Sequence, residues 1–349
     1  MIGKRSFPSR DNEPLQNLEV KHRKIDHDST EPATIPARLQ KIVLHGKNGP
    51  RVDLSACNST LITPLIDYIN AAQLPALTVD PGTRLYLFSL LLHWCPDVKG
   101  MTLRGDEPLA GLDDSWIQQI FNQDCTLQRL SLSDIAVDPE CFSVLTEHIV
   151  RTLKLASLEI AYDYLDEDLD DDRIWIKKIG AALGSEQCVS TLRHLSIDSP
   201  NLDEKSVAEL VKGMRNNTGL TSLLLRCDSD DALMPLLDAL ADEQGVGQLT
   251  DVAIEISDGD LTPRSKKYSD GLARAISTNR KLKSLTVDSA LLARDARDDI
   301  IKAVECSLSL TSFATFNPDD CIPAEIEAVL ARNLRSSTDM AICLAASSY

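Results

Sequence analysis

The chain has few aromatic residues, no long hydrophobic run and no excess of basic residues. Aromatic side chains make up 4% of its 349 residues, so a core must be built from Leu, Ile, Val and Ala. The longest apolar stretch, Leu85 to Trp94, is shorter than the roughly 18 residues that a membrane-spanning helix needs. A formal net charge of −17 argues against nucleic acid or an anionic membrane as partner, because binding to either needs basic side chains.

The nine cysteines lack the spacing of a disulfide framework or of a zinc site. Their number is odd and no CxxC pair occurs, so we expect reduced, mostly buried thiols and a cytosolic working environment. Four of them lie two to four residues before a recurring strand pattern, where a small side chain suits a tight turn: Cys95, Cys125, Cys188 and Cys306. We expect no catalytic thiol, no metal site and no cofactor.

Residues 1–37 are predicted to form a disordered tail. Polar residues and prolines dominate this stretch, and it has too few large apolar residues to offset the entropy lost on ordering. Its acidic and basic residues are nearly balanced, so the negative charge belongs to the remaining chain. The basic start is not followed by the apolar core of a secretory signal peptide.

An L-x-x-L-x-L pattern, with aliphatic substitutes, recurs about ten times after the tail. Its first positions are separated by 35, 24, 29, 28, 37, 28, 29, 33 and 28 residues, so most copies are one unit of about 28 residues with insertions. The copies are Leu39-Ile42-Leu44, Leu74-Leu77-Val79, Val98-Met101-Leu103, Leu127-Leu130-Leu132, Leu155-Leu158-Ile160, Leu192-Leu195-Ile197, Leu220-Leu223-Leu225, Leu249-Val252-Ile254, Leu282-Leu285-Val287, Leu310-Phe313-Thr315 and a last half-unit, Ile342-Leu344.

Amphipathic helix patterns lie between these strand patterns. In the most regular unit, Asp203 is a predicted N-cap, and the apolar residues from Val207 to Met214 fall on one helical face before Asn217 and Gly219 end the helix. Similar patterns follow Leu103, Leu132 and Phe313. One strand and one helix per unit cannot bury their apolar sides alone, so the units must stack around a continuous core.

This repeated strand-plus-helix unit resembles the leucine-rich-repeat proteins, most closely the ribonuclease-inhibitor-like class. The resemblance implies an α/β solenoid over residues 38–349, a horseshoe of about ten to eleven units with a parallel sheet on its concave face and helices on its convex face. The chain departs from the family where an Asn or Cys is expected three residues after the last strand Leu. Ile135, Asp163, Asp228 and Ser257 stand there instead, which favours a less regular horseshoe.

A tail followed by repeats also resembles bacterial effectors delivered by type III secretion. This resemblance implies that the tail is a secretion signal and that the repeats bind a host protein in the host cytoplasm or nucleus; otherwise the protein works in its own cytoplasm. Basic clusters at Lys4-Arg5 and Lys21–Lys24 are compatible with nuclear import. An alternative is an adaptor for a host ubiquitin ligase, with an F-box-like segment within residues 60–95, although Leu74–Leu77 fits a repeat strand better.

In a horseshoe the polar positions of the strand pattern face a partner, so we expect the binding surface there. The middle units carry basic residues at these positions and the units from 249 on carry acidic ones, which predicts a surface divided by charge. The candidate partner-binding residues are Arg104, Arg129, Arg193, His194, Arg226, Glu255 and Asp288.

Two weaker candidates for chemistry lie in the same region. Seven acids between Asp163 and Asp172 could hold calcium, but the Gly and distal Glu of an EF-hand loop are missing, which favours a solvated insertion. His194 and Asp198 lie on one strand face as a general-base candidate, although two surface residues explain them as well. No nucleophile motif accompanies them, so we expect an interaction protein and not an enzyme; an enzyme of another class is the remaining alternative.

Overall fold

The computed structural model describes most of the repeat region. The described residues are 35–40, 43–46, 49–54, 57, 59–74, 76–80, 95, 97–104, 127–133, 155–161, 172–185, 191–200, 202–242, 245–246, 248–257, 265–288, 294–316 and 322–346. The acidic insertion, the expected helices after Leu103 and Leu132, and residues 1–34 of the expected tail therefore lie outside the described residues. In the described part, no helix is long and apolar enough to cross a membrane.

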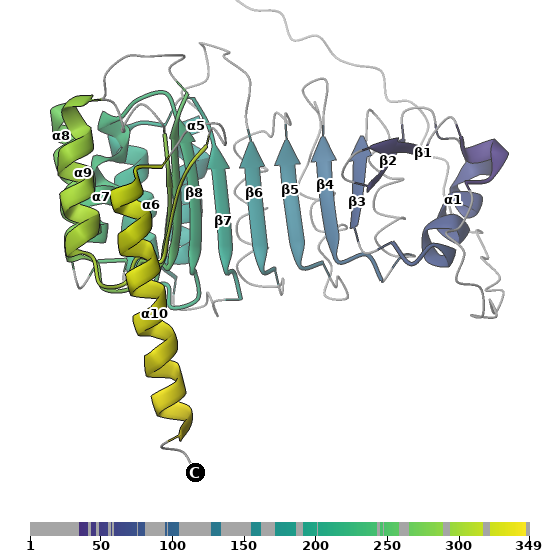
Figure 1. The fold of residues 1–349 in the computed structure, drawn as a ribbon. Coiled ribbons are helices and arrows are strands. Elements are labelled where there is room, and N and C mark those ends of the chain that lie inside the picture. The colour runs from purple at the N-terminus through teal and green to yellow at the C-terminus, as the bar shows by residue number, and fades with distance from the viewer. Residues whose placement is uncertain are drawn as a thin grey trace, which may run out of the picture.

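From β6 to α10, strands and helices alternate along the chain, whereas β3 to β6 follow one another without a described helix between them (Figure 1). The strands are β1 Val43–Gly46, β2 Gly49–Asp53, β3 Ala76–Asp80, β4 Gly100–Arg104, β5 Arg129–Ser133, β6 Ser157–Ala161, β7 His194–Asp198, β8 Ser222–Cys227, β9 Asp251–Ile256, β10 Ser284–Val287 and β11 Ser312–Thr315. The helices are η1 Ala37–Leu39, α1 Ser59–Ala71, α5 Asp172–Leu183, α6 Glu204–Asn216, η2 Asp231–Leu233, α7 Met234–Ala241, α8 Lys266–Thr278, α9 Arg294–Cys306 and α10 Ala324–Ala346.

All eleven strands form one sheet in which the spatial order is the order of the chain. Strands β2 to β11 are parallel to their neighbours, and only β1 pairs with β2 in the antiparallel sense. Parallel neighbours need a crossover connection, so each unit adds one strand to the growing edge of the sheet. The expected α/β class with a parallel sheet is confirmed.

The register aligns equivalent positions of the strand pattern. Leu195 lies opposite Leu158 on one side and Leu223 on the other, and Ile197 lies opposite Ile160 and Leu225 in the same way. These aliphatic side chains are buried, while the residues between them are mostly partly exposed. Because successive strand residues point to opposite faces, one side of the sheet is a continuous apolar wall. The nine strand patterns from Leu74 to Thr315 are therefore confirmed as β3 to β11.

The helices of the second half pack in chain order against the buried side of the sheet. Each helix from α5 to α9 contacts the next one, and Figure 1 shows them on one side of strands β7–β9. The predicted Asp203 cap accepts a hydrogen bond of 2.8 Å from the Ser206 amide at the start of α6. Its apolar residues Val207, Leu210, Val211 and Met214 are buried, as their spacing predicted.

Backbone hydrogen bonds link the beginnings of neighbouring strands in a repeated arrangement. The carbonyl of Arg193 accepts the amides of Thr221 and Ser222, both at 2.9 Å. One unit later the Thr221 carbonyl accepts the amides of residues 250 and 251. The same two-amide arrangement recurs at five further carbonyls, those of Lys99, Gln128, Ala156, Thr250 and Lys283. The units are therefore joined by the main chain, which does not depend on a particular side chain.

The two ends of the sheet differ from the sequence prediction. The Leu39-Ile42-Leu44 pattern is not a repeat strand: Leu39 is buried in η1, and β1 turns back on β2 as a hairpin. The predicted closing half-unit at Ile342-Leu344 is also wrong, because these residues lie in helix α10. Ile35 packs against the core, so the packed body begins before the predicted tail boundary at residue 37.

Candidate interaction face

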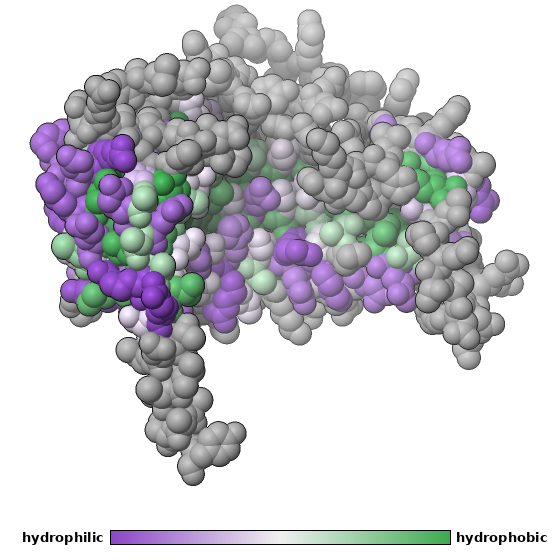
Figure 2. All heavy atoms as spheres, in the orientation of Figure 1, coloured by the Kyte–Doolittle hydropathy of each residue, from purple (hydrophilic) through white to green (hydrophobic). Residues whose placement is uncertain are grey.

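The side of the sheet opposite helices α5–α9 carries mostly small polar side chains, and we call it the open face. Each strand has two buried aliphatic residues, and the residues of the open face lie before, between and after these two. The strand register aligns them in rows across the sheet. The first row is Ala76, Gly100, Arg129, Ser157, His194, Ser222, Asp251, Ser284 and Ser312; the second is Thr78, Thr102, Ser131, Glu159, Ser196, Leu224, Ala253, Thr286 and Ala314. Figure 2 shows hydrophilic residues along the edge of this face where the strands begin.

Arg226 is bound by carboxylates from both neighbouring strands. Its Nε donates to Glu255 at 2.6 Å, a second nitrogen of its guanidinium pairs with the same carboxylate, and a third donates to Asp198 at 2.6 Å. Burial alone would lower the pKa of Arg226, but the hydrogen bonds and charges of Glu255 and Asp198 outweigh burial and raise it. The predicted basic residue Arg226 and acidic residue Glu255 are thus one ion-pair network across β7, β8 and β9.

Two other predicted residues are also held by neighbours within the fold. The Arg193 guanidinium donates to the Gly219 carbonyl at 2.8 Å, in the loop that precedes β8. His194 Nδ1 lies 2.8 Å from Ser222 Oγ on the adjacent strand. Asp198, which the sequence placed beside His194 as a general-base candidate, pairs instead with Arg226. His194 and Asp198 therefore do not form the catalytic pair that was considered.

The remaining predicted residues have different surroundings. Arg129 is exposed on β5, and neither a hydrogen bond nor an ion pair involves its side chain among the described residues. Asp288 is partly exposed just after β10. The backbone of Arg104 pairs with Ser133 at the end of β4, but its side chain lies outside the described part. Among the predicted residues whose side chains are described, Arg129, His194, Arg226 and Glu255 belong to strand positions of the open face, and these four do not form a single cluster.

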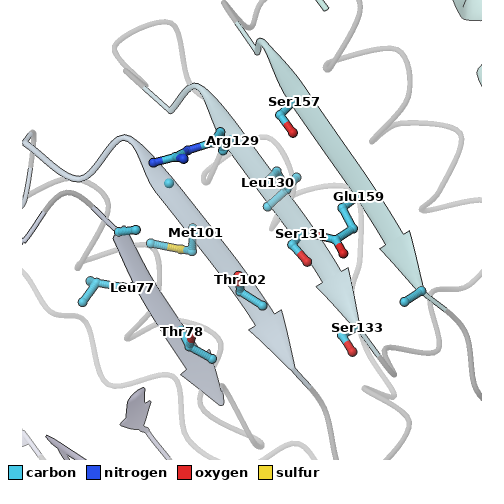
Figure 3. Close-up of a pocket in the computed structure, with 13 residues that line it drawn as sticks. Leu77, Thr78, Met101, Thr102, Arg129, Leu130, Ser131, Ser133, Ser157 and Glu159 are labelled. Carbon is cyan, nitrogen blue, oxygen red and sulfur yellow. The ribbon is translucent and has the colours of Figure 1, made fainter. Parts of the chain in front are cut away.

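A hollow of about 470 Å³ opens over strands β3–β6. Figure 3 shows its floor of small side chains, with Arg129 directed toward β4 and Glu159 directed toward Ser131. Glu159 is exposed and is not among the residues predicted from the sequence. A signal was present, because Glu159 follows Leu158 at the same pattern position that Ser131 occupies one unit earlier, so both belong to one row.

The described residues contain no cluster of three or more His, Cys, Asp or Glu side chains that could hold a metal ion. Three of the four described free cysteines, Cys57, Cys95 and Cys227, are buried, and Cys306 is exposed. Burial is the main cause that raises the pKa of Cys95 to about 12, and the nearby charge of Asp97 adds to it. A thiol with so high a pKa is a poor nucleophile at neutral pH.

No protein-family model and no curated protein matches the sequence. Among solved structures, a chain described as leiomodin-1 actin-binding site 2 matches with 11% sequence identity, covering 67% of this chain and 95% of that chain. The TM-score of this match is 0.28, and a likeness at that level carries no argument about this chain.

Proposed function

We propose that this protein is an interaction module, a leucine-rich-repeat horseshoe of the ribonuclease-inhibitor-like class that binds a partner protein through its open face. The sequential strand order, the aligned leucine-type positions and the repeated backbone link between units support the repeat architecture. The open face supports the binding role. Helices α5–α9 lie on the other side of the sheet (Figure 1), and the hollow over β3–β6 lies on the open face (Figure 3).

The setting that fits the sequence is delivery by a bacterial type III system, with a host protein as the partner. Support for this setting comes only from the tail and repeat pattern of the sequence. The open face adds the expectation that the partner brings complementary charge to it, because charged groups on such a face orient association.

A binding experiment with two matched variants tests the role of the open face. Full-length protein is used as bait in a eukaryotic cell lysate, beside Thr102→Arg on the open face and Lys212→Glu on the exposed side of α6. We expect the arginine to fill the hollow and remove the partner, and the α6 variant to retain it. Loss of the partner with the α6 variant and retention with Thr102→Arg would refute binding through the open face.

The same experiment addresses the adaptor alternative. Recovery of a ubiquitin-ligase scaffold subunit by both the wild type and Thr102→Arg would favour an adaptor with a separate docking segment. Deleting residues 1–97 is a poor test of this alternative, because the deletion removes β3, which pairs with β4, and the buried apolar residues of α1.

A further inference from the structure

The hollow over β3–β6 holds an arginine and a glutamate that do not neutralise each other. Arg129 lies opposite Ser157 in the register, and Glu159 is two residues farther along the same strand β6. Strand geometry places their Cα atoms about 8 Å apart on the same face. In Figure 3 the two side chains point the same way across the sheet, each over the strand before its own, so they do not meet.

Gly100 gives Arg129 its place in this hollow. A Cβ on Gly100 would lie 3.3 Å from Nε of Arg129 and 3.3 Å from the Cβ of Ala76. The guanidinium therefore lies against the backbone of β4, where a larger residue would force it away. The two small residues in the row before Arg129 fix where its donors are presented.

The guanidinium of Arg129 differs from those of Arg193 and Arg226 in its surroundings. Arg226 is bound by two carboxylates and Arg193 by a carbonyl. Neither Arg129 nor Glu159 takes part in a hydrogen bond or ion pair within the described part of the chain. Both side chains line the hollow of about 470 Å³, where an incoming molecule can reach them.

The rest of the floor suits a polypeptide backbone. Its hydroxyl groups can each donate and accept a hydrogen bond, as peptide N–H and C=O groups require. Those hydroxyls belong to Thr78, Thr102, Ser131 and Ser157. Their side chains are short, so a main chain can approach the sheet closely.

We propose that this hollow binds an extended segment of a partner protein that carries one acidic and one basic side chain on the same side. The acidic group pairs with Arg129 and the basic group pairs with Glu159. Alternate residues of an extended segment lie about 7 Å apart, close to the separation of about 8 Å between the Cα atoms of Arg129 and Glu159. This inference rests on the proposed function and specifies the chemistry of the partner.

Ligands with a single charge fit this hollow less well. Such a ligand would cover the second protein charge without pairing it, and an unpaired desolvated charge costs binding energy. A nucleic acid would bring phosphates against Glu159 and against a protein of net charge −17. A mixed-charge peptide satisfies both groups.

The test uses four sets of synthetic octapeptides with small polar residues at the other positions. Their fixed residues, two apart, are Glu and Lys, Glu and Gln, Gln and Lys, or Gln and Gln, in either order. Binding to full-length wild type, Arg129→Gln, Glu159→Gln and the helix control Lys302→Gln is measured by fluorescence polarisation. We expect wild type and Lys302→Gln to bind the Glu and Lys set about tenfold more tightly than either single-charge set.

Each hollow variant is expected to lose one part of this selectivity. Arg129→Gln should bind the Glu and Lys set no more tightly than the Gln and Lys set, and Glu159→Gln should no longer respond to Lys. A variant that is merely misfolded would bind all four peptide sets with similarly reduced affinity. Absence of peptide binding up to millimolar concentration, or binding that ignores the peptide charges, would overturn this inference. Partner capture lost only in Thr102→Arg would leave the proposed function intact in that case.

Discussion

Three arginines that the sequence predicts for one surface, Arg129, Arg193 and Arg226, have different surroundings in the fold. Arg129 takes part in no ion pair with the residues that the structure describes, Arg193 is bound to a backbone carbonyl, and Arg226 is bound to two carboxylates. From the sequence all three are predicted to be basic residues of one binding surface. Since Arg226 is neutralised within the fold, it contributes structure to β7–β9 more than positive charge to a partner.

Replacing Arg226 should destabilise the protein. In Arg226→Gln the carboxylates of Asp198 and Glu255 remain close together and lose their shared cation, so we expect a loss of about 1–3 kcal/mol in the free energy of unfolding. Arg274→Gln is the matched control, because Arg274 pairs with Asp238 between two helices where both side chains are more than half exposed. The loss in the free energy of unfolding for Arg274→Gln should stay below about 1 kcal/mol, as for surface ion pairs. Equal losses in urea unfolding would contradict the structural role of the network.

The buried thiol of Cys95 should make stability depend on alkaline pH. Its folded-state pKa is about 12 and its ordinary value is 9.0, so the folded protein retains a proton that the unfolded chain releases. The resulting stabilisation is complete below pH 9 and is lost as pH rises from 9 to 12, by up to about 1.4 kcal/mol per pH unit. Urea unfolding from pH 8 to 10.5 should show a steeper decline for wild type than for Cys95→Ala. Parallel declines would show that Cys95 is not responsible.

At the scale of elements, two helices approach closely because glycines face each other. A Cβ on Gly213 of α6 would overlap the carbonyl of Gly180 in α5, and a Cβ on Gly184 would lie 3.1 Å from Gly213 Cα. Both obstacles are backbone atoms, which cannot rotate away. The close approach of α5 and α6 therefore depends on the absence of side chains at these positions.

Gly213→Ala should lower the free energy of unfolding by about 2 kcal/mol, because overpacking outweighs the better helix propensity of alanine. Gly271→Ala in α8 is the control, since its added Cβ would meet only the side chains of Met234 and Leu237. Those side chains can shift, so this variant should be nearly neutral. Thermal or urea unfolding of both proteins measures the difference. A neutral Gly213→Ala would mean that the two helices can separate without cost.

The strands could be predicted from the sequence because each copy repeats the same buried pair. The end elements could not. The residues between Leu39 and Leu44 have the required apolar spacing, yet β1 pairs antiparallel with β2, a strand that carries no complete copy of the pattern. At the other end, Ile342 and Leu344 alternate like a strand but continue helix α10. The spacing of apolar residues within a segment does not determine which strand or helix that segment will pack against at the end of the sheet.

The link between units on the helical side was also missed. Asn217 accepts the amides of Gly219 and Leu220 and donates to the Leu183 carbonyl of the preceding unit. Asn279 repeats these contacts with its own loop and with the Leu240 carbonyl. Each Asn precedes the first Leu of a strand pattern by three residues, so the spacing was visible.

For the whole molecule, the repeat distance predicts contacts between polar residues that the apolar strand pattern does not include. Asp198, Arg226 and Glu255 are separated by 28 and 29 residues, the same intervals as their strands, and so occupy one row. His194 and Ser222 are likewise 28 residues apart and lie opposite each other. Both contacts could have been predicted by carrying the repeat over to the polar positions. The identity of the partner could not be predicted in this way, because the repeat distance relates only residues of this chain to one another.

A stack in which units contact mainly their neighbours should not lose stability evenly. Leu225 of β8 is fully buried between two paired strands, whereas Phe313 belongs to β11, which pairs only with β10 among the described strands. We expect Leu225→Ala to speed native-state hydrogen exchange in β7, β8 and β9 together. Phe313→Ala should speed exchange in β11 and α10 and leave the amides of β7 unchanged. If both variants raise exchange equally from β3 to β11, the sheet opens as one cooperative unit, and the nearest-neighbour description of this fold is wrong.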